Sequence, residues 1–408
     1  MTLACKHGRN RHQRMHAQGY WHLVAIGEPF RLLFPVGLCL GIFGVLLWPI
    51  YVWKGTYPYP GVAHARIMIE GFMTCFVAGF LGTALPRLLG APHIKLRESL
   101  TIATGLIATT WLHSKGQTFW GDQIFFFTLL TLILTLGMRV VVRHDIPPPA
   151  FVLVVMGLLS ALFGVSLFLL NALSPLTQPP WSPALARLLL YQGYLLLPVM
   201  GISAYMLPRF FALPNRQNFE VSLTPPRGWL PEFLIALSCG LLLLASFIVE
   251  ISGKIQAAYA LRASIVIFYT LRALPLHKAG LGGGTLALGA RLALLSLPVG
   301  FTLIVYQPAF VLALLHVVYI TGFSLLTLIV ASRVVLGHSG QASRFQATLR
   351  PILLTIFLLS LAMLTRVTAD WFPHIRLSHY AYASISWILG SLVWGCTILP
   401  SVRRADTT

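Results

Sequence analysis

The residues of this chain that could do chemistry are ionisable side chains within or beside long apolar stretches of the sequence. Glu70 and His316 are each surrounded by apolar residues, and His64 precedes Glu70 by six positions. Because an ionisable group is costly to place inside a bilayer, such residues are the first candidates for function. Further polar residues near the ends of the apolar stretches are His113, Asp122, Asp370, His374 and His379. We expect Glu70, His374 and His379 to form a cluster at the outer face of a membrane.

Imidazole suits a metal site in such surroundings, because it ligates haem iron and copper at neutral pH without a charge to bury. His64 and His316 are therefore our candidate metal ligands. Two alternatives stay open from the residues alone. A histidine near a membrane face can be a solvated interface residue, and His316 can be a structural histidine bonded to a neighbouring helix.

A second candidate site follows His316 along the chain, in the segment Arg333-Val-Val-Leu-Gly-His338-Ser-Gly340. On one straight helix His316 and Arg333 would be about 25 Å apart, so this site is separate from the first. An arginine fork followed by Gly-His-Ser-Gly could bind an anionic group such as a haem propionate or a lipid phosphate. A helix C-cap with a cytoplasmic charge explains the same residues equally well.

The elements that position these side chains follow from the composition. Of 408 residues, 57% are hydrophobic and 10% are charged, and the mean hydropathy is +0.80. Soluble proteins have about 25% charged residues, which excludes a soluble enzyme. The apolar residues come in runs of roughly 18–25, the length that crosses a bilayer as a helix. We expect an all-α polytopic membrane protein with about twelve transmembrane helices, at residues 32–53, 67–89, 99–113, 119–142, 149–173, 185–208, 229–251, 257–275, 285–306, 309–333, 349–369 and 380–400.

The charges indicate how the chain lies in the bilayer. Lysine and arginine number 29 against 10 acidic residues, a formal net charge of +19. These cations fall in short loops, where membrane insertion explains them, so we expect no nucleic-acid partner. With the N-terminus inside, about 21 cations are cytoplasmic and about 8 are not, which predicts that both termini are cytoplasmic. We expect a basic tail at 1–30, one transmembrane domain at 31–400 and a short tail at 401–408, in the cytoplasmic (inner) membrane.

Similar sequences at three helix ends suggest an internal repeat. The second span ends in GFLGTALPR at Arg87, the sixth in GISAYMLPR at Arg209, and the tenth in ASR at Arg333. The spacing would fit three four-helix repeats around a pseudo-threefold axis, as in the catalytic subunit of haem–copper oxidases. These offsets place Glu70, Gln192 and His316 in register. The alternative is that insertion puts a cation at every cytoplasmic helix end.

Three blocks of the sequence resemble the NnrS family, membrane proteins of the bacterial nitric-oxide response. One is Gly27-Glu-Pro-Phe-Arg31, and another is the stretch 64–90, with Gly71-Phe72 and Pro86. The most distinctive block comprises His316, Thr321-Gly322, Ser332-Arg333-Val334 and Leu336-Gly337-His338-Ser339-Gly340. Together the three blocks cover about a fifth of the chain.

The resemblance implies a haem-binding protein of the bilayer that acts on nitric oxide or a related small ligand, in denitrification or in tolerance of nitrosative stress. It implies His64 and His316 as metal ligands, and Arg333 and His338 as partners of an anionic group. The family is also associated with copper, and its second span opens Trp-His-x-His-Glu. This chain has Ala63-His64-Ala65-Arg66-Ile67, so Arg66 replaces the second histidine and weakens the expectation of copper.

Other functions compete with this one. A multi-pass transporter or channel without a redox cofactor could use Glu70, His316 and Asp370 as an ion or proton path. A respiratory oxidase or nitric-oxide reductase subunit would need histidines on its sixth, seventh and tenth helices. The spans 185–208 and 229–251 contain no histidine, which excludes the complete catalytic site of that class.

Overall fold

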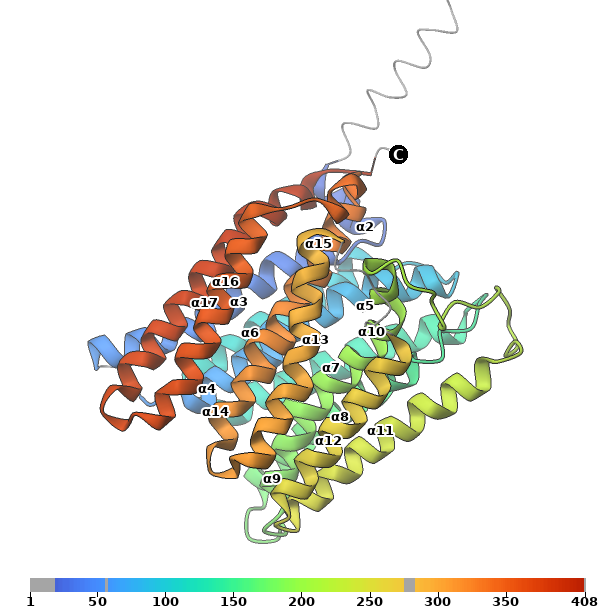
Figure 1. The fold of residues 1–408 in the computed structure, drawn as a ribbon. Coiled ribbons are helices and arrows are strands. Elements are labelled where there is room, and N and C mark those ends of the chain that lie inside the picture. The colour runs from blue at the N-terminus through green and yellow to red at the C-terminus, as the bar shows by residue number, and fades with distance from the viewer. Residues whose placement is uncertain (1–18, 56–57, 275–282, 407–408) are drawn as a thin grey trace, which may run out of the picture.

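The computed structural model describes residues 19–55, 58–274 and 283–406, and within these ranges the chain forms helices and loops with no strand (Figure 1). Most of the expected tail at 1–30 lies outside the described residues. The uninterrupted long helices are α3 (Phe30–Lys54), α6 (Leu96–Ser114), α7 (Thr118–Val141), α8 (Phe151–Leu173), α11 (Trp229–Ile251), α12 (Ile255–Ala273), α13 (Gly284–Tyr306), α16 (Arg350–Thr368) and α17 (Arg376–Ile398).

Three further long helices are composite, because a short α-helix, a wider π-helical segment and a second α-helix follow one another without a break. The first consists of α4 (Gly61–Arg66), η1 (Ile67–Met73) and α5 (Thr74–Leu88), the second of α9 (Ser182–Arg187), η2 (Leu188–Gly193) and α10 (Tyr194–Met206), and the third of α14 (Val311–His316), η6 (Val317–Ser324) and α15 (Leu325–Gly337). π-Helical segments are rare and occur mostly at functional sites. Because three helices contain such a segment, we expect a functional site between these helices.

Ten of the helices in the described residues are long and apolar enough to cross a membrane. They occupy ten of the twelve expected spans. The other two expected positions are held by α6 and α12, which are helical but fall short of that apolar character. One residue that lowers the apolar character of α12 is Arg262, which is fully buried. Its guanidinium donates to Gln192 at 3.0 Å and pairs with Glu250 at 2.6 Å. The expectation of twelve spans remains a prediction.

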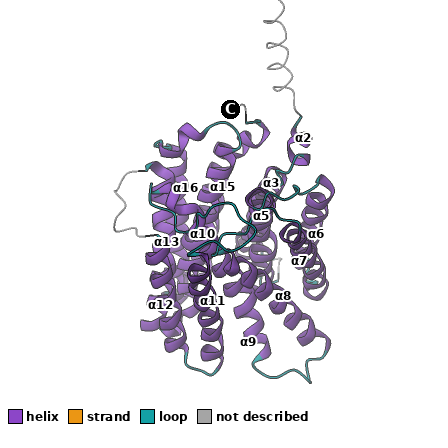
Figure 2. Ribbon diagram, turned by 90° about the vertical axis from the view of Figure 1, so that its right-hand side faces the viewer, coloured by secondary structure: helices purple, strands orange, loops and turns teal. Residues whose placement is uncertain are grey.

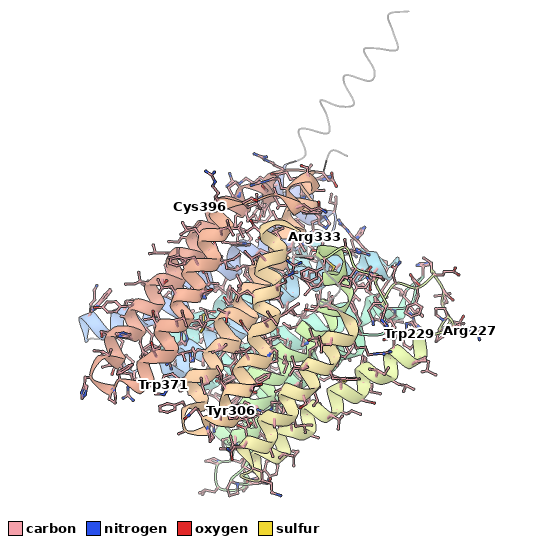
Figure 3. All side chains as sticks on the ribbon, in the orientation of Figure 1. Arg227, Trp229, Tyr306, Arg333, Trp371 and Cys396 are labelled. Carbon is pink, nitrogen blue, oxygen red and sulfur yellow. The ribbon has the colours of Figure 1, made fainter. Side chains whose placement is uncertain are left out.

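Both ends of the described chain lie at the same end of the helix bundle. The short helix α2 (Tyr20–Ala25) contacts η10 (Leu399–Arg403), and Figures 1 and 2 place both beside the C-terminus. Figure 3 shows Arg333 and Cys396 toward that end and Tyr306 and Trp371 toward the other. Such an arrangement is what an even number of spans produces. We call the end with the termini the terminal end.

Candidate functional site

A cavity of about 1250 Å³ lies among the three composite helices. Figure 1 places α4, α9 and α14, whose residues line it, toward the end of the bundle opposite to the termini. The cavity walls are mostly apolar and aromatic. The histidine, charged and amide side chains that line the cavity are His64, Arg187, Gln192, Glu250, His316 and Arg366. The three π-helical segments each contribute residues, so the irregular backbone lies where a cavity tolerates it.

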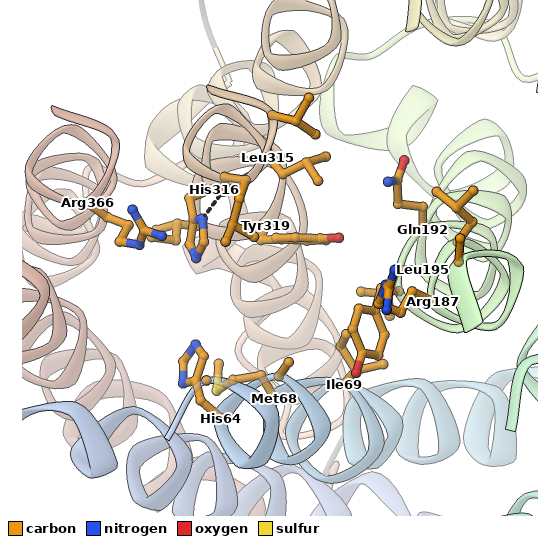
Figure 4. Close-up of a pocket in the computed structure, with 18 of the residues that line it drawn as sticks. His64, Met68, Ile69, Arg187, Gln192, Leu195, Leu315, His316, Tyr319 and Arg366 are labelled. Atoms are coloured by element: carbon orange, nitrogen blue, oxygen red, sulfur yellow. Dashed lines mark hydrogen bonds between the residues drawn. The ribbon is translucent and has the colours of Figure 1, made fainter. Parts of the chain in front are cut away.

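His64 and His316 face this cavity from two different composite helices (Figure 4). The Nδ1 atom of His64 lies 3.0 Å from the carbonyl oxygen of Gly44, and Nδ1 of His316 lies 2.7 Å from that of Leu312. A carbonyl only accepts, so each Nδ1 carries the proton and donates it, which we assign from these bonds. Each Nε2 then keeps its lone pair, and an orienting bond at the other nitrogen is typical of metal-ligating histidines. The structure thus brings the two predicted ligands to one cavity.

Two arginines add positive charge to the same cavity. Arg366 is paired with Asp370 at 3.1 Å and lies over the ring of Tyr380, 4.1 Å from its centroid. Arg187, on α9, lines the wall on the other side of the cavity in Figure 4 and forms no ion pair with a described carboxylate. Guanidinium groups bind carboxylates through two parallel hydrogen bonds. The cavity therefore offers two imidazole nitrogens together with donors for an anionic group.

Glu70 lies elsewhere, in a closed cluster that sequence reasoning did not assemble. Its Oε2 accepts from Nε2 of His113 on α6 at 2.9 Å. Asp122 on α7 lies beside them, with Oδ1 3.7 Å from Nε2 of His113 and Oδ2 2.9 Å from a guanidinium nitrogen of Arg66. All four side chains are buried. We call Arg66, Glu70, His113 and Asp122 the closed cluster.

The expected outer-face cluster of Glu70, His374 and His379 is not formed. His374 is exposed, while His379 donates from Nδ1 to the carbonyl of Ile375 at 3.1 Å. Neither histidine contacts Glu70, because Glu70 projects between α6 and α7 and these histidines belong to η9 (Pro373–Ile375) and α17. Glu70, Gln192 and His316, which the repeat offsets placed in register, do not form one site. Gln192 and His316 line the cavity, and Glu70 does not.

At the terminal end, Glu28 lies in a network of cations. Its carboxylate accepts from Arg31, from Arg87 at 2.8 Å and from Nδ1 of His338 at 2.7 Å. Arg31 is almost fully buried and also donates to the carbonyl oxygens of His338 and Val402, at 2.7 and 2.6 Å. Burial alone would raise the pKa of Glu28, but the hydrogen bond from His338 and the charges of Arg31 and Arg87 lower it to about 2. We call Glu28, Arg31, Arg87 and His338 the terminal network.

The terminal network draws one or two residues from each of the three sequence blocks that suggested a family. The model of the NnrS protein family matches residues 25–405, nearly the whole chain. The chain belongs to the NnrS family. No individual curated protein matches it. In this NnrS-family chain the first block supplies Glu28 and Arg31, the second Arg87 and the third His338, so one contact site unites them.

The structure separates Arg333 from His338, which we expected to act together. In this NnrS-family chain, His338 belongs to the terminal network. The guanidinium of Arg333 lies instead between the rings of Phe210 and Phe345, 4.4 and 4.3 Å from their centroids. Arg209 lies beside it, and both arginines line a second cavity of about 220 Å³. The internal sequence similarity had placed Arg209 and Arg333 at equivalent helix ends, which is consistent with their lying side by side. The block that resembles the NnrS family contains Arg333 and His338, and for that reason we had expected those two to act together.

Proposed function

We propose that this chain is a haem-binding, NnrS-like protein of the cytoplasmic membrane that acts in the response to nitric oxide, in denitrification or in tolerance of nitrosative stress. The observation that carries the proposal is the pair His64 and His316, which present unprotonated Nε2 atoms to one cavity. Family membership supports the same role. The function is argued from this site, since a fold by itself does not determine chemistry.

The residues present fit a haem. Imidazole Nε2 is the usual protein ligand of haem iron, and the chain offers two. The cavity volume of about 1250 Å³ exceeds the roughly 300–1,000 Å³ of common small-molecule sites, as a large planar cofactor requires. Arg187 and Arg366 would bind its propionates. When bound, haem would supply an iron that takes up nitric oxide directly.

The protein's own part is to hold the ligands and to admit the small molecule. Gly44 and Leu312 fix the orientation of the two imidazole rings through their carbonyl oxygens. The apolar lining of the cavity favours a neutral diatomic gas over water. Arg66 occupies the position of the family's second histidine, and its guanidinium pairs with Asp122. A guanidinium is no metal ligand at physiological pH, so we propose haem and no copper bound through that position.

The test is an absorption spectrum with iron and copper analysis of the purified protein. We expect a Soret band and about one iron per chain. His64→Ala and His316→Ala should each lose most of the haem. His144→Ala is the matched control and should keep the haem, because His144 is a loop residue whose ring bonds the carbonyl of Gly90 at 3.0 Å and does not line the cavity. A wild-type protein without iron, copper or a Soret band would refute the proposal.

We further propose twelve spans in three four-helix repeats, with both termini in the cytoplasm. Each of η1, η2 and η6 lies in the second helix of a repeat, and a glycine of the first helix packs against it. A Cβ on Gly44 would lie 2.6 Å from Ile67, and one on Gly300 would lie 2.6 Å from Val318. Gly164 on α8 approaches η2 in the same way. If no common rotation superposes the three groups of helices, the repeat is refuted.

A transporter without a redox cofactor is the second candidate. The observation in its favour is a large cavity lined by Arg187, Glu250 and Arg366, since charged residues at membrane depth mark substrate paths. It predicts substrate-dependent flux in liposomes from protein that contains no haem. Haem in stoichiometric amount, lost in His316→Ala, would favour the first proposal over this one.

We also propose that Arg333 binds an anionic group, with Arg209 as its partner in place of His338. Among the described residues neither arginine is in an ion pair with a carboxylate, and Arg333 uses one hydrogen bond, to the carbonyl oxygen of Arg209 at 3.4 Å. The aromatic rings of Phe210 and Phe345 hold its plane, which leaves the fork available to a phosphate or carboxylate.

A further inference from the structure

The closed cluster carries a charge that its surroundings do not balance. Glu70 and Asp122 bring two negative charges when ionised, and Arg66 brings one positive charge. Glu70 is fully buried, and Arg66 and Asp122 are each 4% exposed. With a neutral His113 the cluster has a net charge of −1 inside the bundle. An uncompensated buried charge is among the most costly arrangements in a protein, so one further positive charge is required.

Unpaired atoms show where that charge can be held. Within the part of the chain that the structure describes, Oε1 of Glu70, Oδ1 of Asp122 and Nδ1 of His113 are buried and have no hydrogen-bond partner, and neither have Nε and Nη1 of Arg66. Oε1 of Glu70 lies 3.5 Å from Nε of Arg66, an ion-pair contact that forms no hydrogen bond. One carboxylate oxygen each of Glu70 and Asp122 and one ring nitrogen of His113 all lie within 4.8 Å of one another. A buried acceptor without a donor is costly, because it has lost its hydrogen bonds to water. A proton placed on a carboxyl oxygen satisfies an acceptor and neutralises the cluster at once.

We propose that Glu70 and Asp122 form a buried proton-binding site that holds one proton between them, with Arg66 balancing the remaining carboxylate. His113 orients the pair, since its Nε2–H donates to Glu70 at 2.9 Å, and Arg66 donates to Asp122 at 2.9 Å. Two carboxylates that share a site cannot both ionise cheaply, which is how such pairs retain one proton. The site does not depend on the presence of haem.

A metal ion fits the same atoms less well. For His113 to ligate through Nε2, its proton would move to Nδ1, which has no acceptor in the described structure. Metal-ligating histidines nearly always donate from the other nitrogen. A divalent ion would also leave the cluster at +1 beside the guanidinium of Arg66, whereas one proton leaves it neutral.

The site lies directly behind the cavity wall. Met68 and Ile69 of η1 line the cavity, and the next residue, Glu70, faces the cluster. From η2, Tyr191 lies 5.7 Å from the Arg66 guanidinium and also lines the cavity, and Arg187 on α9 is the next charged group beyond it. From α8 the apolar ring of Phe168 faces Arg66, with its centroid 3.6 Å from the guanidinium carbon. Adjacent residues of η1 therefore belong to the cavity wall and to the proton site.

The test is infrared spectroscopy of the purified full-length protein at neutral pH, in H₂O and D₂O. A protonated carboxyl absorbs apart from a carboxylate and shifts in D₂O. We expect the difference between wild type and Glu70→Gln, and between wild type and Asp122→Asn, to show the loss of one protonated carboxyl. Glu98→Gln is the matched control, because Glu98 is paired with Arg139 at 2.6 Å and should show the loss of a carboxylate only.

Changes in the other two residues make the proposal quantitative. Arg66→Gln removes the balancing charge, so the protonated-carboxyl signal should rise about twofold, while Arg66→Lys should leave it unchanged. His113→Gln should retain the signal. Where a variant fails to fold, isotopic labelling of aspartate and glutamate carboxyls in the wild type must still shift the band. Two results would overturn the proposal. The first is a wild-type spectrum without the protonated-carboxyl band, which would place the proton on His113 or nowhere. The second is a stoichiometric metal ion in the wild type that is lost in Glu70→Gln, which would make this a metal site.

Discussion

Replacement of Glu28 by glutamine tests whether the terminal network stabilises the fold. The folded protein lowers the pKa of Glu28 from 4.5 to about 2. A group with a depressed pKa in the folded state contributes stability above its unfolded pKa and loses it as the pH falls toward the folded value. The contribution of Glu28 is therefore complete above about pH 5 and disappears between about pH 4.5 and 2. Because part of the network is hydrated, we put it at about 2–3 kcal/mol.

Equilibrium unfolding of the detergent-solubilised protein, followed by circular dichroism at several pH values, measures this contribution. At pH 7, Glu28→Gln should be less stable than wild type by about 2–3 kcal/mol. The difference should shrink as the pH is lowered to 3, because the unfolded wild type binds a proton at Glu28 below about pH 4.5 and must release it to fold. Glu220→Gln, at an exposed position, is the control and should match wild type throughout. A difference of equal size at pH 7 and pH 3 would show that the charge of Glu28 is not the cause.

Three further predictions follow from named contacts. Arg31→Lys should cost about 3 kcal/mol in the same unfolding assay, because a lysine cannot bond Glu28, His338 and Val402 at once, whereas the exposed Arg376→Lys should cost nothing measurable. Arg333→Lys should weaken phosphate binding at the second cavity by about tenfold, since the ammonium loses both the fork and the aromatic sandwich; unchanged binding would leave Arg333 with a topological role only. In a background without native cysteines, an impermeant reagent applied to whole cells should label Ser378→Cys and spare Ser343→Cys, and the reverse pattern would invert the topology.

The helices were the predictable part of this structure. Length and apolar composition place a helix in each expected span, and the residues that weaken two of them, such as Arg262, are visible in the sequence. The sequence does not show which residue pairs with Arg262. Glu250 lies twelve positions away on the preceding helix, and only the packing of α11 against α12 brings the two together.

The candidate site was predictable in part. His64 and His316 were singled out as an imidazole pair, and they do share a cavity. The π-helical segments that form its walls could not have been expected, since apolar periodicity is similar for a helix with or without a widened turn. The grouping of Glu70 with His374 and His379 failed because proximity to one membrane face says nothing about which helices are neighbours. Contacts between helices decide that, and they depend on side-chain packing along the whole bundle.

The closed cluster contains the residue by which this chain departs, at the start of the second span, from the NnrS pattern that it resembles. Where the family has histidine and glutamate, this chain has Arg66 and Ile67, which removes one carboxylate and adds one cation. Glu70 restores a carboxylate one turn later, and its Oε1 lies 3.5 Å from Nε of Arg66. Asp122 on α7 accepts a hydrogen bond from the guanidinium at 2.9 Å. Arg66 and Glu70 are thus parts of one unit: without Arg66 both carboxyls must be protonated, whereas without Glu70 the charges of Asp122 and Arg66 balance.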